Sequence, residues 1–263
     1  MDFIDTHSHL YDEAFDEDIE AVVERAKAAG VKQCIFPGID SGCYDKMISL
    51  SKKLEGFALP GIGLHPTSID ESYRKELDFV YEKIEQEKFY AIGEIGMDCY
   101  WSTEFIDAQR IAFKEQLILA AKKDLPVIIH SRNATEEIFS VMDETLEEIK
   151  SFNGVLSGTF HAYSGSYETY LRLAKYGDFY VGIGGVLTYK NAGIASVIEK
   201  IPLERIILET DSPWLTPAPH RGKRNESSYV AIIAENIARI KQVPIEEVAL
   251  VTTNNAKKLF RLD

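Results

Sequence analysis

The feature that most constrains the fold of this chain is a repeated alternation of short apolar runs with longer amphipathic segments. Each apolar run has strand length, ends near Gly, His, Asp or Pro, and is followed by a segment with helical spacing of apolar residues. The predicted strands are residues 3–6, 33–36, 58–63, 90–92, 127–129, 155–160, 179–183 and 206–208. The predicted helices are residues 16–29, 44–54, 75–85, 105–123, 135–149, 167–175, 195–199, 229–240 and 246–260. Strands that alternate with helices favour a parallel sheet.

The length of the chain decides between two parallel architectures. Its 263 residues fit one (β/α)8 barrel, which takes about 250 residues. The alternative, an open doubly wound sheet, needs a Gly-rich turn after the first strand, and the sequence has Thr-His-Ser-His-Leu there. No linker or low-complexity segment divides the sequence. We therefore predict an α/β fold of the TIM-barrel type, with residues 1–263 as a single domain.

The charge balance limits how the protein can meet a polyanion. The sequence has 42 acidic and 29 basic residues, for a net charge of −13. Such a surface repels DNA as a whole. Any contact with nucleic acid must therefore be local.

The cysteines and the hydropathy of the sequence predict the cellular compartment of the protein. The three cysteines have no CxxC spacing, which argues against a disulfide framework or a zinc knuckle and fits a reducing compartment. The first residues carry no basic segment followed by a long apolar run, as a secretory signal would. No apolar run approaches the length of a membrane span. We therefore expect a soluble, cytoplasmic protein with no membrane partner.

Polar residues follow several predicted strands, where the active sites of barrels lie. The first strand leads into His7 and His9, and residues two apart on a strand point to the same side. Other strand ends carry Glu94, His130, His161 and Asp211. A mixed set of imidazoles and carboxylates suits zinc, manganese or similar ions.

Glu94 is the natural bridging residue of a two-metal site. A carboxylate has two oxygens and can hold two ions ~3.5–4 Å apart. We assign one ion to His7, His9, Glu94 and Asp211, and the other to Glu94, His130 and His161. Bound metal lowers the pKa of water toward ~7, and Asp211 could also accept the proton of that water. Two dications would make the pocket locally positive and attractive to phosphate.

Basic residues near the strand ends are candidates for substrate binding. His65 could contact a phosphate or the attacking water, or cap a proline turn. Arg132 could hold a phosphate bidentately, or pair with an acidic neighbour on the surface. Arg221, Lys223 and Arg224 make the densest basic patch of the chain, either a rim that contacts phosphates or a solvated loop.

Two further groups of residues have open roles. Trp101 and Trp214 follow strand ends, where they could stack on bases or pack inside loops. Asp5 shares the face of His7 and could orient an imidazole or serve a buried structural role. Glu209 shares the face of Asp211 and could order the strand end.

Motifs in a fixed order run along nearly the whole chain. They are DTHSHL at Asp5, GLHP at Gly63, GEIGMD at Gly93, IHSRNA at Ile129, FHAYSGS at Phe160, ETDSPWL at Glu209, GKRNE at Gly222 and NNAKKLF at Asn254. This set resembles the TatD family of metal-dependent deoxyribonucleases, within the amidohydrolase superfamily. The resemblance implies hydrolysis of DNA phosphodiesters with magnesium, manganese or zinc, and exonuclease action from the 3′ end. It also implies the ligand assignment above. The sequence departs from the family pattern at Cys99, Asn133, Ala162 and Ser227, and none of these is a predicted ligand.

Three functions follow as hypotheses. The first is a divalent-metal-dependent deoxyribonuclease that uses a metal-activated water, with Asp211 and Glu94 as catalytic residues and single-stranded DNA or a 3′ end as substrate. The second is an amidohydrolase-type enzyme that acts on a small-molecule amide, lactone or phosphoester. Many such relatives have a carboxylated lysine on the fourth strand, where this chain has Glu94. The third is a metal-holding binding protein without turnover, and the intact ligand set argues against it.

Overall fold

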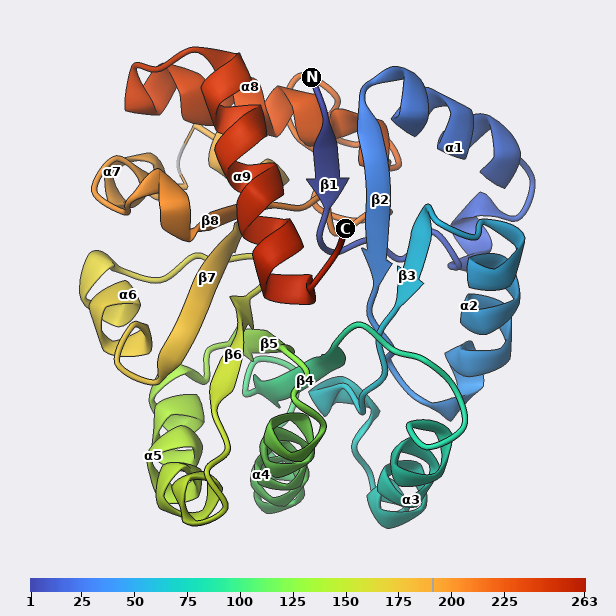
Figure 1. The fold of residues 1–263 in the computed structure, drawn as a ribbon, viewed down its shortest axis with the longest axis vertical. Helices are drawn as coiled ribbons and strands as arrows, with labels where there is room; N and C mark the ends of the chain where they lie inside the picture. The colour runs from blue at the N-terminus through green and yellow to red at the C-terminus, as the bar shows by residue number, and fades with distance from the viewer. Residues whose placement is uncertain (191) are drawn as a thin grey trace.

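The computed structural model describes residues 1–190 and 192–263, and strands alternate with helices along this part of the chain (Figure 1). The strands are β1 (Phe3–Asp5), β2 (Val31–Phe36), β3 (Ala58–Pro60), β4 (Ile92–Asp98), β5 (Val127–Arg132), β6 (Leu156–Phe160), β7 (Gly177–Ile183) and β8 (Ile206–Leu208). The helices are α1 (Ile19–Ala28), α2 (Ser41–Lys53), α3 (Tyr73–Lys83), α4 (Ile106–Lys123), α5 (Thr135–Ser151), α6 (Tyr167–Leu173), α7 (Ala195–Ile198), α8 (Val230–Lys241) and α9 (Ile245–Phe260).

The strands form a closed ring of parallel neighbours. They pair in the orders β1-β2-β3 and β4-β5-β6-β7-β8. A parallel bridge between Ile62 and Ile92 joins the two sets beyond β3, and another between Ser8 and Ser212 joins them beyond β1 and β8. The amide of Thr6 also donates to the carbonyl oxygen of Leu208 at 3.0 Å. The predicted TIM barrel is therefore confirmed.

The inside of the barrel is an apolar core that α9 closes at one end. Inward side chains such as Ile4, Ile128 and Ile207 pack with Leu259 and Phe260 from the end of α9. The helix crosses the end of the barrel where the strands begin (Figure 1). The end where the strands finish is therefore the one left for a site.

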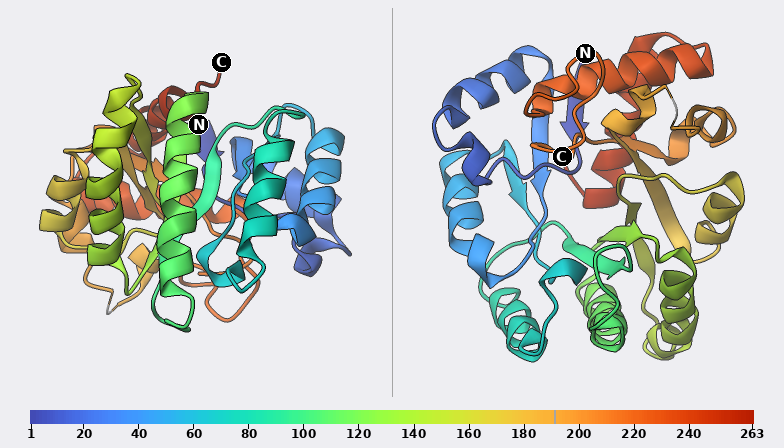
Figure 2. Two further views of the ribbon diagram at one scale, coloured as in Figure 1. Left: turned by 90° about the horizontal axis from the view of Figure 1, so that it is seen from below. Right: turned by 180° about the vertical axis from the view of Figure 1, so that it is seen from behind.

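The other helices form the outer layer. Their apolar faces join one large core with the outward side of the strands, and the turned views show them standing around the ring (Figure 2). None of the helices in the described ranges combines the length and hydropathy needed to cross a membrane.

The largest difference from the predicted elements lies in β4. We predict a strand that ends at residue 92, whereas β4 continues to Asp98. Gly93 and Gly96 make this stretch look like a loop in the sequence. In the structure they allow close approach to β5, because a Cβ on Gly96 would lie 2.1 Å from the carbonyl oxygen of His130. Likewise, β5 extends past the predicted residue 129 to Arg132.

Two smaller differences lie near the start of the chain. The predicted strand 58–63 is shorter, since β3 ends at Pro60. The predicted helix 16–29 is shorter as well, because α1 begins at Ile19 after a separate 3-10 turn, Glu13–Phe15. The side chain of Asp12 caps that turn by accepting from the amide of Ala14 at 2.8 Å.

Candidate metal centre

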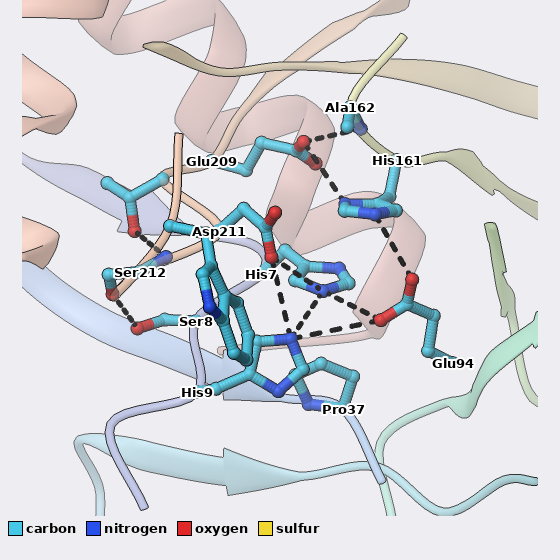
Figure 3. A network of polar contacts seen from close by, with 12 residues as sticks. His7, Ser8, His9, Pro37, Glu94, His161, Ala162, Glu209, Asp211 and Ser212 are labelled. Carbon is cyan, nitrogen blue, oxygen red and sulfur yellow. Dashed lines mark hydrogen bonds and ion pairs between the residues drawn. The ribbon is translucent and has the colours of Figure 1, made fainter. Parts of the chain in front are cut away.

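Several strands bring imidazoles and carboxylates together at the end of the barrel where the strands finish, and Figure 3 shows His7, His9, Glu94, His161 and Asp211 turned toward one another. His7 and His9 follow β1, Glu94 lies within β4, His130 lies within β5, His161 follows β6 and Asp211 follows β8. The structure therefore brings together all six residues that the sequence predicts as ligands. His65, which follows β3, joins them.

The β1 pair faces one oxygen of Glu94. His7 Nε2 lies 3.1 Å from Glu94 Oε2, and His9 Nε2 lies 3.8 Å from the same oxygen. Asp211 Oδ1 lies 3.6 Å from His7 Nε2 and 3.5 Å from His9 Nε2. The two Nε2 atoms are 3.0 Å apart. Four donor groups thus enclose one small volume.

The other oxygen of Glu94 faces a second group. Glu94 Oε1 lies 2.9 Å from His130 Nδ1, 3.1 Å from His161 Nε2 and 3.3 Å from His65 Nε2. The strand pairing shifts by one residue between Ile92 and Ile95. Such a bulge redirects a side chain, and here Glu94 is the residue that it places between the two groups.

The donor atoms fit divalent cations. His7, His9 and Asp211 offer ligand atoms within 4.8 Å of one another, as do His65, Glu94 and His130. Such nitrogen and oxygen sets bind zinc and manganese, and carboxylates also bind magnesium. Glu94 is 3% exposed, and a carboxylate so deeply buried requires compensating positive charge.

The electrostatics of the cluster keep Glu94 ionised. Burial favours a raised pKa for this carboxyl, but His161, His65 and His7 hold the pKa of Glu94 well below its usual range. Burial and the neighbouring His161 lower the pKa of His7, so its ring is neutral and can ligate a cation. For His161, Glu94 and Glu209 outweigh burial and raise the pKa well above its usual value. Metal binding at His161 must therefore release a proton.

Two residues that the sequence analysis missed set the orientation of ligand rings. Tyr11 donates its hydroxyl hydrogen to the carbonyl oxygen of Pro37, so it accepts from His9 Nδ1 at 2.7 Å and leaves the Nε2 lone pair free. Asp98 Oδ2 lies 2.9 Å from His130 Nε2, which leaves Nδ1 to face Glu94. Glu94 and Asp98 are four residues apart, so on one strand their side chains point to the same side. The sequence could have indicated the contact of Asp98 with His130 only if β4 had been predicted to reach Asp98.

The structure shows which of the roles left open by the sequence each of Asp5 and Glu209 has. Asp5 accepts from Thr210 N at 2.9 Å and pairs with Thr210 Oγ1 at 2.6 Å, so it joins β1 to the end of β8 and orients no imidazole. Glu209 Oε1 accepts from Ala162 N at 2.5 Å and lies 3.4 Å from His161 Nδ1. Glu209 therefore forms an ion pair with a predicted ligand and holds the chain just beyond β6.

The predicted substrate-binding residues divide into two kinds. Arg132, Arg221 and Lys223 are exposed. Arg224 is instead engaged with the start of α1, because its guanidinium binds both carboxylate oxygens of Asp18 at 2.7 Å. The basic loop after β8 therefore has a structural contact at Arg224.

Comparisons with known proteins agree with this geometry. The model of the family described as TatD related DNase matches residues 4–261. The chain belongs to this family. The predicted family resemblance is thus confirmed over nearly its whole length.

The relatives of this TatD-family chain are similar from end to end. It is 39% identical over 260 residues to the uncharacterized metal-dependent hydrolase YabD of Bacillus subtilis, covering 98% of this chain and 99% of the relative. It is 33% identical over 271 residues to the human deoxyribonuclease TATDN3, covering 98% and 94%. Among solved structures, the TatD homolog YJJV of Escherichia coli superimposes with a TM-score of 0.87 at 29% identity, covering 99% and 98%.

Proposed function

We propose that this chain is a divalent-metal-dependent deoxyribonuclease with two ions at the mouth of the barrel. The observation that carries the proposal is the position of Glu94, whose two oxygens face two separate groups of imidazoles. One ion is assigned to His7, His9, Glu94 and Asp211. The other is assigned to Glu94, His130 and His161, with His65 beside it. Magnesium, manganese or zinc fits these donors.

The ions and the side chain of Asp211 would have different roles in hydrolysis. Divalent ions held in such a site activate water and neutralise phosphate charge. Asp211 is the carboxylate that water reaches, since its side chain is 14% exposed whereas that of Glu94 is 4% exposed. The imidazoles hold the pKa of Asp211 below its usual value against the effect of burial. It is therefore ionised at neutral pH, and its carboxylate can receive the proton of the attacking water.

The DNA substrate is supported by the relatives and by local charge. The family description and the name of the human relative both specify DNA cleavage. In a protein with a net charge of −13, the exposed cations around the site are Arg132 at the end of β5 and Arg221 and Lys223 in the loop after β8. A single strand or a 3′ end is the form of DNA we propose, cleaved in the 3′–5′ direction in the cytoplasm.

The test is cleavage of DNA in the presence of magnesium, manganese or zinc. Single-stranded, double-stranded and 3′-phosphate-blocked oligonucleotides distinguish exonuclease action from internal cutting. We expect Asp211→Asn to lower kcat by roughly 10²-fold or more, because it removes a ligand and a proton acceptor.

The control for this variant is His220→Ala. His220 stacks on Tyr229 with ring centroids 4.5 Å apart, outside the cluster, so this variant should cleave like the wild type. Undiminished cleavage by Asp211→Asn, or none by the wild type with any metal, would contradict the proposal. Turnover confined to amides or lactones would instead support the amidohydrolase alternative.

A further inference from the structure

Both tryptophans of the chain stand at the mouth of the barrel. The sequence contains two, and Trp101 is 70% exposed while Trp214 is 50% exposed. Trp101 follows β4 and Trp214 follows β8. In the closed ring, β4 and β8 lie four strands apart. The two indoles therefore lie on opposite sides of the barrel mouth, with the cluster of predicted metal ligands between them.

Each tryptophan contacts a residue of the candidate metal centre. The ring of Trp214 contacts His9 edge to face, with centroids 5.0 Å apart. The amide of Trp101 donates to Asp98 at 3.3 Å, and the same carboxylate orients His130. A ligand that rests on both indoles must therefore pass over the cluster.

Arginines add positive charge to both sides of the mouth. The guanidinium of Arg132 lies 3.8 Å from the centroid of the Tyr100 ring and 5.1 Å from that of Trp101. The guanidinium of Arg221 lies 4.1 Å from the centroid of the Tyr189 ring. Stacking leaves the edge of a guanidinium available to a phosphate.

Most other arginines are held by carboxylates. In the described part of the chain, the arginines in ion pairs are Arg25, Arg74, Arg110, Arg172, Arg205, Arg224 and Arg261. Arg132 and Arg221 are not among them. In so acidic a protein, two guanidinium groups outside any ion pair, one beside the exposed indole of Trp101 and one over the ring of Tyr189, favour a ligand that is both anionic and aromatic.

The exposure of the indoles decides between the two roles left open by the sequence. A tryptophan that serves loop packing buries its ring, because an exposed aromatic surface of this size forgoes a large hydrophobic gain. We propose that Trp101 and Trp214 stack on nucleobases on either side of the scissile phosphate. Arg132 and Arg221 then contact the flanking phosphates. The inference rests on the proposed nuclease function and deepens it, because only unpaired bases can stack in this way, so the site selects single strands or frayed ends.

Intrinsic fluorescence tests the stacking without turnover. Trp101→Phe and Trp214→Phe each leave one indole, so emission reports one side of the mouth at a time. We expect a hydrolysis-resistant phosphorothioate oligothymidylate, with magnesium present, to quench both variants. An oligomer of abasic tetrahydrofuran nucleotides has the same charge without bases and should quench neither. Equal quenching by the two oligomers, or none by either, would overturn the inference whether or not the protein cleaves DNA.

Kinetics provide a second test. Trp101→Ala and Trp214→Ala should each raise KM for single-stranded DNA by roughly 5- to 100-fold, as expected for the loss of one stacked base. The ratio of kcat/KM for the oligonucleotide to that for methyl p-nitrophenyl phosphate should fall accordingly. Phe152→Ala is the matched control, because Phe152 is 37% exposed but lies at the opposite end of the barrel, after α5. An unchanged ratio in both tryptophan variants would contradict the proposal.

Discussion

Glu94 shows how single residues make this centre possible. An ionised carboxylate that is buried without partners costs several kcal/mol. Here imidazoles on both sides offset that cost and keep the pKa of Glu94 low. The same imidazoles are the predicted ligands, so the residues that keep Glu94 ionised are also the ones that would hold the cations.

Asp5 is a buried carboxyl whose titration can be isolated. Burial raises the pKa of Asp5 from 3.8 to about 7 in the folded protein. Between these values the folded state binds a proton that the unfolded state has released, so the contribution of Asp5 to stability falls as pH rises. Asp5→Asn keeps the contacts to Thr210 without the titration. From pH 5 to pH 8, the wild type should lose about 3 kcal/mol of unfolding free energy relative to Asp5→Asn.

The measurement is urea unfolding of both proteins in chelator at the two pH values. Taking the difference between the two proteins cancels the titration of the histidines, which both share. A constant difference would show that Asp5 titrates at its ordinary pKa. An increasing advantage of the wild type at high pH would show that the carboxylate is stabilised instead.

At the same scale, residue type and position predict the ligands but not their supports. His7, His9 and Asp211 could be predicted as ligands because histidines and carboxylates at the ends of barrel strands are typical of a metal site. Tyr11 and Asp98 could not, because each acts through one hydrogen bond that depends on ring orientation and on the true length of β4.

Among the elements, β4 depends most on glycine, because it packs very closely against β5. Gly96 has φ 139° and lies against β5, where an added Cβ would meet the carbonyl oxygen of His130. Gly96→Ala should therefore cost more than about 3 kcal/mol of unfolding free energy and displace His130. The measurements are urea unfolding and metal titration.

Gly56→Ala is the matched comparison for Gly96. Gly56 also has a positive φ, of 81°, but nothing lies within 4 Å of the position that a Cβ would take there. The substitution should cost only about 1–2 kcal/mol, from backbone strain alone. Similar losses in the two variants would mean that close packing of β4 on β5 contributes little.

The same glycines explain why the boundaries of elements were harder to predict than their order. Hydrophobic periodicity marks β1, β7 and β8 well, since their apolar runs coincide with the strands. In β4 the run Gly93–Asp98 contains two glycines and two acidic residues, and its apolar residues Ile95 and Met97 stand apart from one another, so the pattern indicates a loop. Its extended conformation depends on pairing with β5, which only the tertiary structure provides.

For the molecule as a whole, bound metal should act as a stabilising ligand. The proposed ions connect side chains from β1, β4, β5, β6 and β8, which only the folded state brings together. At a metal concentration one hundred times Kd, one site contributes about 2.7 kcal/mol. For a chain of this size that raises Tm by roughly 5–10 °C.

Calorimetry with magnesium, manganese or zinc and with excess chelator measures this shift. His220→Ala should keep it, whereas Glu94→Gln should lose most of it, because the bridging carboxylate serves both ions. A Tm that does not respond to metal in the wild type would contradict the two-ion assignment. The assignment of residues 1–263 as one domain stays a prediction, and a single cooperative transition would support it.

The wide spacing of the ligands along the chain also determines when the site can exist. Translation adds Asp211 only 202 residues after His9. At synthesis rates of about 5–20 residues per second, the first two ligands wait on the order of ten seconds or more for the last one. A nascent or prematurely terminated chain thus lacks a complete ligand set. If the protein cuts nucleic acid, it is harmless to the messenger that encodes it until the barrel closes.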